Sequence, residues 1–207
     1  MQHIGITGGI GSGKSTVTQM WVRCGAQAID ADQLSRDLTR SGGAAIDLIR
    51  QAFGPAAIGS DGAMDRAHMR ERVFSDPHVK AQLEAILHPM IRDASERLSQ
   101  AARLSGAQVL VHDIPLLVES GRHGRHLDRV LVVDCSPETQ VSRVMARSGL
   151  SRDEVLRIIQ AQASRQARLA AADWVIVNED ISLSELEREV QALYQLALTP
   201  KGRPARQ

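Results

Sequence analysis

Five short apolar runs along the chain predict the strands of a sheet. They lie at residues 3–7, 26–29, 109–111, 130–133 and 174–177. As a set, these runs do not alternate apolar with polar residues, which is typical of strands that are covered on both faces. Longer segments with helical patterns separate them. The pattern therefore predicts an α/β fold, in which helices flank a parallel five-stranded sheet.

Helices are predicted from apolar spacing and from start signals. After residue 14, apolar side chains recur at the intervals of one helical face, at Val17, Met20, Trp21 and Cys24, and Gly25 marks the expected end. Another helix is expected to begin at Ser151, where Glu154 completes a capping box. The last helix is expected to start near Ser182.

Two long segments interrupt the alternation of strands and helices. Residues 33–105 hold helical patterns and turns but no convincing strand, which is too long for one crossover and suggests an inserted helical lobe. Residues 136–170 form a second helical segment, with six arginines and only two acids between Arg143 and Arg168. The remaining core is then expected to comprise residues 1–32, 106–135 and 171–200.

Composition narrows the classes of function. The net charge is +1 and only 2% of residues are aromatic, which argues against nucleic-acid binding. Cys24 and Cys135 are too few for a disulfide framework and too far apart for a zinc site, so we expect a reducing cytoplasm. No stretch approaches the roughly 20 apolar residues of a membrane span. We expect no membrane segment or signal peptide, and no protein partner is implied.

The segment "GGIGSGKS" at residues 8–15 matches the pattern G-x-x-x-x-G-K-[ST] between a predicted strand and a predicted helix. Glycines allow successive amides to point at one anion, and the helix aims its positive end at the same place. Lys14 is expected to reach the β- and γ-phosphates and Ser15 to ligate Mg²⁺. The expected nucleotide-binding residues are Gly11, Ser12, Gly13, Lys14, Ser15 and Thr16.

The same loop serves GTPases, ATP-driven machines and small-molecule kinases. A GTPase would carry Asn-Lys-x-Asp, whereas residues 178–180 read Asn-Glu-Asp. An ATP-driven machine usually has an acidic pair at a strand end, whereas residues 112–115 contain one acid. A small-molecule kinase needs an acid near the acceptor hydroxyl, an acceptor pocket and mobile cations. The chain offers candidates for all three, so a kinase is favoured and a nucleotide-binding switch is the alternative.

The candidate acids follow predicted strands, at the edge where ligands of open α/β sheets bind. Asp32 is placed to accept a hydrogen bond from the acceptor hydroxyl and to orient it for in-line attack. Asp30 fits either such a role or a helix cap. Asp113 ends the third strand, and two roles stay open for it. It could hold Mg²⁺ through water, or it could position the acceptor.

Arginines supply the candidate mobile cations. Arg143 and Arg147 lie four residues apart on one helical face, and a lid at residues 136–170 that carries them could close over ATP and exclude water. The other arginines of this segment are interpreted mostly as solvated surface charges: Arg152, Arg157, Arg165 and Arg168. In the helical lobe, His88-Pro89 predicts by position alone a helix-breaking turn with a capping histidine.

Taken in order, these motifs resemble the dephospho-coenzyme A kinase family, and the likeness covers most of the chain. It is carried by "IGITGGIGSGKST" (4–16), "IDAD" (29–32), "DGAMDRAHMRERVF" (61–74), "LEAILHPMI" (83–91), "DIPLLVESG" (113–121), "SRVMARSGLSRDEVLRIIQAQ" (142–162) and "AADWVIVN" (171–178). The resemblance implies the P-loop kinase fold. It also implies phosphorylation by ATP of the ribose 3′-hydroxyl of dephospho-coenzyme A, and three parts: core, acceptor-binding lobe and lid.

The resemblance also implies roles for single residues. Asp32, Lys14 and Arg143 are expected to be catalytic, with Asp32 on the acceptor hydroxyl and Arg143 on the phosphates. Arg147 and Asn178 are expected near the adenine. The acceptor pocket is expected to include Asp32, His88, Asp113, Leu116 and Leu117. Val118 departs from the family pattern, in which this position is more often aromatic. A kinase of the same architecture with a different acceptor is the neighbouring alternative.

Overall fold

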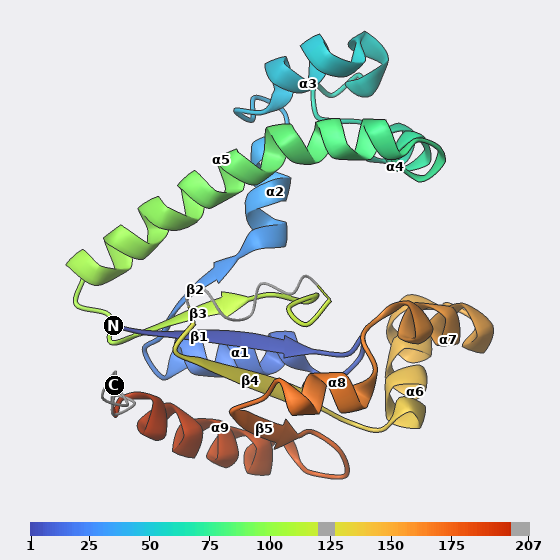
Figure 1. Ribbon diagram of the computed structural model, residues 1–207. Helices are drawn as coiled ribbons and strands as arrows, with labels where there is room; N and C mark the ends of the chain where they lie inside the picture. Colours follow the sequence, from blue (N-terminus) through green and yellow to red (C-terminus); the bar gives the residue numbers. More distant parts are fainter. Residues whose placement is uncertain (120–126, 200–207) are drawn as a thin grey trace, which may run out of the picture. The chain divides into compact units, whose positions relative to one another are not determined.

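The computed structural model describes residues 1–119 and 127–199, and the chain forms two compact units (Figure 1). The sheet unit comprises Met1–Ile29 and Ala102–Gln207, and the helical unit comprises Asp30–Ala101. The predicted core segments 106–135 and 171–200 include residues 120–126 and 200, which lie outside the described residues.

The sheet has five strands in the order β2-β3-β1-β4-β5. Their bounds are β1 Gln2–Gly8, β2 Gln27–Asp30, β3 Val109–Asp113, β4 Arg129–Asp134 and β5 Trp174–Val177. β1 pairs in parallel with both β3 and β4, with Ile6 opposite Asp113 on one side and Leu131 on the other. The predicted parallel five-stranded sheet is therefore confirmed, and the carboxyl ends of its central strands meet at one edge.

Helices of the sheet unit cover both faces of the sheet. Their bounds are α1 Lys14–Arg23, α6 Pro137–Ser148, α7 Arg152–Ala161, α8 Arg165–Ala170 and α9 Leu183–Ala197. α1 and α9 pack on one face, where fully buried Trp21 meets Trp174 and Tyr194 edge to face, at ring-centroid distances of 6.4 and 5.9 Å. On the other face Val130 and Val132 pack with Leu169 of α8. Burial on both sides explains why the strands read as apolar runs.

The predicted helix starts are confirmed. Ser151 accepts a hydrogen bond from the Glu154 amide and Glu154 bonds back to the Ser151 amide, which forms the expected capping box of α7. Ser182 and Glu185 form the same arrangement at α9. Each box satisfies two amides that a helix start leaves without an intrahelical partner.

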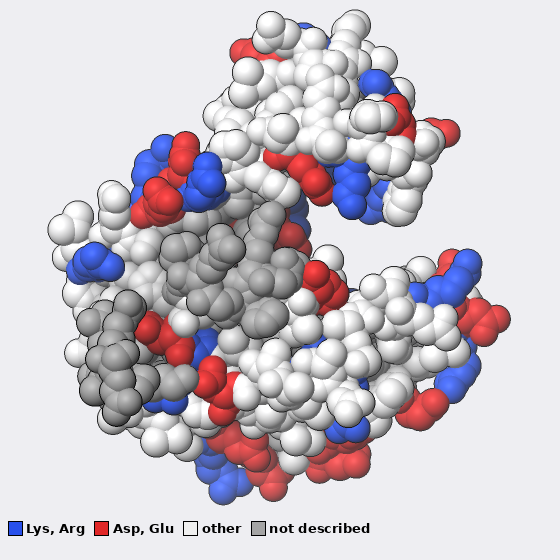
Figure 2. Space-filling view, viewed as in Figure 1, with Lys and Arg blue, Asp and Glu red and all other residues white. Residues whose placement is uncertain are grey.

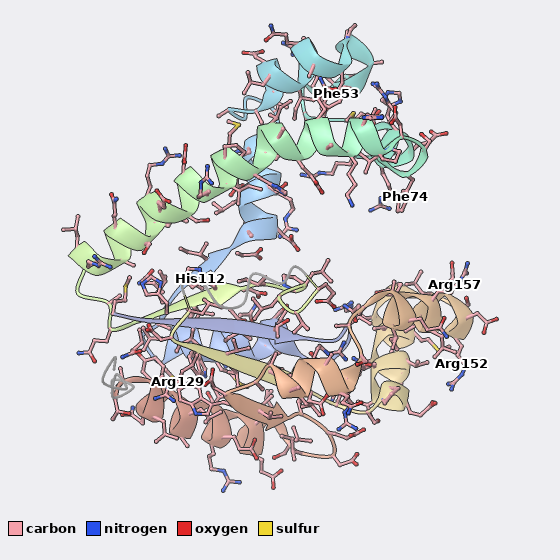
Figure 3. All side chains as sticks on the ribbon, in the orientation of Figure 1. Phe53, Phe74, His112, Arg129, Arg152 and Arg157 are labelled. Atoms are coloured by element: carbon pink, nitrogen blue, oxygen red, sulfur yellow. The ribbon has the colours of Figure 1, made fainter. Side chains whose placement is uncertain are left out.

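The helical unit is built around a small core of its own. Its helices are α2 Ala31–Thr39, α3 Ile46–Phe53 and α4 Arg66–Ser75, with a short 3-10 turn at Pro55–Ala57, and the long helix α5 runs Pro77–Leu104. Ile49, Phe53 and Met69 are buried together in this core. Phe53 is enclosed, whereas the Phe74 side chain points outward and is 84% exposed (Figure 3).

The predicted turn at His88-Pro89 is wrong, because Pro89 lies inside the continuous helix α5. A proline in a helix removes one backbone hydrogen bond and normally kinks or ends the helix. Here apolar residues on both sides of Pro89, including Leu83, Leu87 and Met90, pack against the core of the helical unit. This burial outweighs the lost hydrogen bond and keeps the helix continuous.

Charges are well mixed on the surface. On the face shown in Figure 2, basic and acidic side chains of the described residues are interspersed rather than gathered by sign.

Among the helices of the described residues, none combines the length and apolar character that a membrane crossing requires. Cys135, which directly follows β4, is buried, and burial raises the pKa of its thiol.

Candidate active site

The glycine-rich loop connects β1 to α1 with a backbone that only glycine adopts easily. Gly11 has a φ of 75° and Gly13 a φ of 90°, both in the left-handed region. A side chain at Gly13 would also overlap the amide nitrogen of Asn178. Within the loop, the Ser12 amide donates to the Gly9 carbonyl at 3.1 Å. Gly11 and Gly13 are therefore needed for conformation as well as for close packing.

The start of α1 is open to a ligand. Gly13 is its N-cap, and no side chain of the described residues caps this helix end. The first amides of a helix have no intrahelical acceptor, and the helix dipole places partial positive charge at the same end. The other helices of the sheet unit begin instead at a serine, such as Ser136, Ser151 or Ser182, whose hydroxyl accepts from a backbone amide. The exception is consistent with an anion acting as the cap.

Lys14 and Asp113 form an ion pair at this edge of the sheet. Their side chains are 14% and 9% exposed, so the pair is largely shielded from water. The Thr18 hydroxyl donates to Asp113 Oδ2 at 3.3 Å and to the Lys14 carbonyl at 3.1 Å. The end of β3 thus places a carboxylate directly beside the lysine of the glycine-rich loop.

Asn178 follows β5 and holds the glycine-rich loop through a hydrogen bond. Its buried side-chain amide donates to the Ser12 carbonyl at 2.8 Å, a contact between residues 166 positions apart. The loop is therefore held at a strand end of the same sheet. This hydrogen bond was not predicted, although Asn178 itself was expected at the site.

A pocket of about 300 Å³ adjoins the start of α1. Its lining comes from the glycine-rich loop, α1, α6, the segment after β5 and the start of α9: Gly13, Thr16, Arg143, Asn178, Ile181, Ser182, Leu183 and Leu186. Arg143 is one of these lining residues, and its Nη1 is buried without a hydrogen-bond partner among the described residues. Buried donors are normally paired, so this nitrogen is available to an acceptor on a ligand. Arg147, the other predicted arginine of α6, is exposed.

Glu179 fastens the start of α6 to the segment after β5. Its carboxylate accepts hydrogen bonds from the hydroxyls of Ser136 and Thr139, and from the Ser136 amide at 3.1 Å. These donors, the Ser136 hydroxyl first, lower the pKa of Glu179. The contact fixes α6, and with it Arg143, relative to Asn178. Glu179 was not among the predicted site residues.

The interpretation of the later arginines as surface charges is confirmed for some and wrong for one. Arg152 and Arg157 are exposed on α7, and their side chains point outward in Figure 3. Arg165 is 48% exposed and forms a bidentate ion pair with buried Asp134. Arg168 is buried, with 5% of its surface exposed, because α8 packs against β4 and the glycine-rich loop.

The helical unit carries two of the predicted acceptor residues. Asp32 is in the first turn of α2, and its side chain is exposed. His88 is exposed on α5, next to Pro89. Asp30 is the N-cap of α2 and accepts from the Gln33 amide at 2.9 Å, which realises the capping role foreseen for it.

The two leucines that were predicted to line the acceptor pocket lie in the sheet unit and differ in their exposure to solvent. Leu116 is 51% exposed and can contact a ligand. Leu117 is 1% exposed and packs with Val130 and Val132, so its burial does not support the predicted acceptor contact.

The oxygen ligands near the glycine-rich loop suit a magnesium ion that binds together with the phosphates of a nucleotide. Among the described residues, no group of three or more His, Cys, Asp or Glu side chains could hold a metal. Ser15 offers a hydroxyl in the first turn of α1, and Asp113 offers a carboxylate beside Lys14. Mg²⁺ usually keeps several waters and binds through one or two protein groups plus substrate phosphates. The residues present therefore fit Mg²⁺ bound to a nucleotide.

A parallel sheet with this strand order, a glycine-rich loop after its central strand and an uncapped helix behind that loop together define the P-loop kinase fold. Comparison with known proteins makes the assignment specific. The family model described as dephospho-CoA kinase matches residues 2–183, and the chain belongs to this family.

Relatives support the assignment over nearly the whole chain. The dephospho-CoA kinase of Burkholderia thailandensis is 50% identical over 195 residues, covering 94% of this chain and 95% of the relative. That of Thiobacillus denitrificans is 51% identical over 199 residues, covering 96% of each chain.

Solved structures agree on the fold. The structure of TT1252 from Thermus thermophilus has a TM-score of 0.79 at 39% identity, covering 94% of this chain and 97% of that one. Shikimate kinase from Bacteroides thetaiotaomicron has a TM-score of 0.55 at 17% identity, covering 94% and 97%, which is a likeness of fold alone.

Proposed function

We propose that the protein transfers the γ-phosphate of ATP to the ribose 3′-hydroxyl of dephospho-coenzyme A and so completes coenzyme A synthesis. Membership of the dephospho-CoA kinase family supports the reaction. The observation that carries the chemistry is the uncapped start of α1 beside the Lys14–Asp113 pair. A phosphoryl-transfer enzyme needs backbone amides that bind phosphate and a lysine beside them, and both lie at this strand end.

The nucleotide would bind wholly within the sheet unit. Its phosphates would lie against the amides from Gly11 to Thr16, with Lys14 on the β- and γ-phosphates. Its adenine would occupy the pocket beside Asn178, whose leucine and isoleucine side chains suit a flat apolar ring. Arg143, with its unpartnered nitrogen, would contact the phosphates, and Arg147 would lie near the adenine.

The acceptor would be bound with the help of the helical unit, residues Asp30–Ala101. Asp32 would accept a hydrogen bond from the 3′-hydroxyl and hold it in line with the phosphorus, and His88 and Leu116 would contact other parts of the molecule. Phosphoryl transfer depends mainly on positioning and charge stabilisation, so Asp32 would act by orienting the acceptor hydroxyl. For Asp113, its pairing with Lys14 favours a role at the phosphates over one at the acceptor.

The segment of α6 to α8, residues 136–170, would act as the lid, because it carries the arginines that face the nucleotide. Mg²⁺ bound with ATP would be held through Ser15 and would neutralise charge on the phosphates. We further propose a cytoplasmic location, which agrees with the two free thiols of Cys24 and Cys135.

The test is incubation of the purified protein with ATP, Mg²⁺ and dephospho-coenzyme A, followed by mass analysis. Appearance of coenzyme A, dependent on all three components, supports the proposal. A panel with shikimate, other nucleosides and polyols tests the neighbouring alternative of a different acceptor. Slow ATP hydrolysis that no acceptor accelerates would contradict a kinase and favour a nucleotide-binding switch.

A further inference from the structure

Arg168 is the buried cation that the proposed mechanism does not use. It lies on α8 with 5% of its surface exposed. Its guanidinium makes a single hydrogen bond within the described residues, from Nη1 to the Ala163 carbonyl at 2.5 Å. Across residues 1–119 and 127–199, no carboxylate lies within ion-pair distance of it. A buried charge without a partner is costly, so a counter-charge is expected from elsewhere.

The neighbouring arginine shows what a satisfied cation looks like on the same helix. Arg165 donates two hydrogen bonds to Asp134 Oδ2, from Nε at 2.9 Å and from Nη2 at 2.6 Å. It is so paired although its side chain is nearly half exposed. The carboxylate of Glu119 accepts from the amide of Ala163 at 2.6 Å, whereas Arg168 donates to the carbonyl of the same residue. The more deeply buried of the two arginines is therefore the one that lacks a protein anion.

Arg168 lies against the first half of the glycine-rich loop. A side-chain carbon built on Gly9 would be 2.9 Å from Arg168 Nη2 and would overlap the Gln140 amide. The loop is fixed at this point, since the Ile10 amide donates to Gln162 Oε1 at 3.0 Å and the Ile10 side chain packs with Val141 and Val155. The guanidinium thus adjoins a part of the loop that is held by contacts with other segments.

The pocket beside Asn178 lies at one end of the glycine-rich loop, and Arg168 lies at the other. That pocket is lined by Gly13 and Thr16, at the end of the loop that continues into α1. Gly9 and Arg168 are at the opposite end, next to β1. If its base fills the pocket and its phosphates follow the loop, a bound nucleotide would direct its last phosphate toward Gly9 and Arg168.

We propose that Arg168 is the counter-charge for the terminal phosphate of the bound nucleoside triphosphate. A guanidinium matches phosphate oxygens in geometry and cannot lose its charge, which suits a site that must hold a group about to be transferred. This role rests on the proposed nucleotide site but does not depend on the identity of the acceptor.

The test compares the affinities of Mg²⁺-bound ATP and ADP, measured by calorimetry without acceptor. Arg168→Met removes the charge while keeping a long apolar side chain. It is expected to weaken ATP binding by roughly ten- to a hundredfold and ADP binding much less, because only ATP carries the terminal phosphate. Turnover with dephospho-coenzyme A should fall as well. Arg165→Met is the matched control, one turn away on α8, and should leave the ATP-to-ADP affinity ratio at the wild-type value.

A purely structural role for Arg168 predicts a different result. It would lower the melting temperature and weaken ATP and ADP by the same factor, and that outcome would overturn the proposal. If Arg168→Met does not fold, the role of Arg168 can be tested on the wild-type protein by NMR. The ¹⁵N side-chain signal of Arg168, assigned by its loss in Arg168→Lys, should shift with a non-hydrolysable ATP analogue and less with ADP. Equal or absent shifts would refute the role.

The proposed acceptor is tested separately. Failure of the wild-type protein to form coenzyme A would remove the acceptor assignment but would leave the ATP-to-ADP ratio as a valid test of Arg168.

Discussion

The contact between Gly13 and Asn178 allows the loop geometry to be tested by a double-mutant cycle. Gly13→Ala adds one carbon at a position with a φ of 90°, where it would overlap the Asn178 amide nitrogen. Asn178→Ala removes that nitrogen and with it the hydrogen bond to the Ser12 carbonyl. The two substitutions therefore act on one shared contact.

The magnitudes follow from two separate costs. A non-glycine residue in the left-handed region costs about 1–2 kcal/mol. Leaving the buried Ser12 carbonyl without its donor costs about 1–3 kcal/mol. Gly13→Ala should incur both costs, because the new carbon displaces Asn178. Asn178→Ala should incur only the second. The double variant loses the hydrogen bond once, so its loss should match that of Gly13→Ala alone.

Urea unfolding of the wild type, both single variants and the double variant measures the cycle. The expected interaction free energy equals the hydrogen-bond cost, about 1–3 kcal/mol, with the double variant more stable than the sum of the singles predicts. Losses that add to within about 0.5 kcal/mol would refute the reasoning. Additivity would mean that the added carbon leaves Asn178 in place and that the loop yields instead.

Three further predictions concern single charged residues. Lys14→Ala should weaken ATP binding and slow turnover, since it removes the cation at the phosphates, and calorimetry that returned a wild-type ATP affinity would exclude the assigned role of Lys14. Asp32→Ala should retain ATP affinity and lose several orders of magnitude in kcat, and a kcat close to that of the wild type would remove Asp32 from the mechanism. Glu179 has a pKa lowered from the ordinary 4.5, so its hydrogen bonds stabilise the fold above that pH and the stabilisation is lost as the pH falls through the lower folded value. Glu179→Gln should therefore be less stable than the wild type at neutral pH, with the difference shrinking in acid, whereas a difference independent of pH from 7 down to 3 would show that the carboxylate charge is irrelevant.

The parts of the fold that sequence predicted well are those encoded locally. Each strand is a short apolar run, and each capping box is a serine and a glutamate three residues apart, so neither needs knowledge of distant residues. The glycine-rich loop is similar, because its left-handed glycines and its helix start are all contained within residues 8–16. Lys14 and the end of β3 could be brought together because parallel strands end at a common edge.

The features that were missed depend on residues far apart in the chain. Pro89 was expected to end a helix on local grounds, but packing against the core of the helical unit decided otherwise. The burial of Arg168 follows from how α8 packs, which no nearby residue reveals. The same holds for the hydrogen bond of Asn178 to Ser12 and that of Ile10 to Gln162, which join positions more than 150 residues apart.

The clustering of aromatic residues behind the sheet has a practical consequence for spectroscopy. Both tryptophans of the chain and its one tyrosine pack together in the sheet unit, at Trp21, Trp174 and Tyr194. The helical unit contains neither residue type. Intrinsic fluorescence excited at 280 or 295 nm consequently reports the melting of one unit only, whereas far-ultraviolet circular dichroism reports both. A mismatch between the two signals during heating would reveal independent unfolding of the fluorescently silent helices.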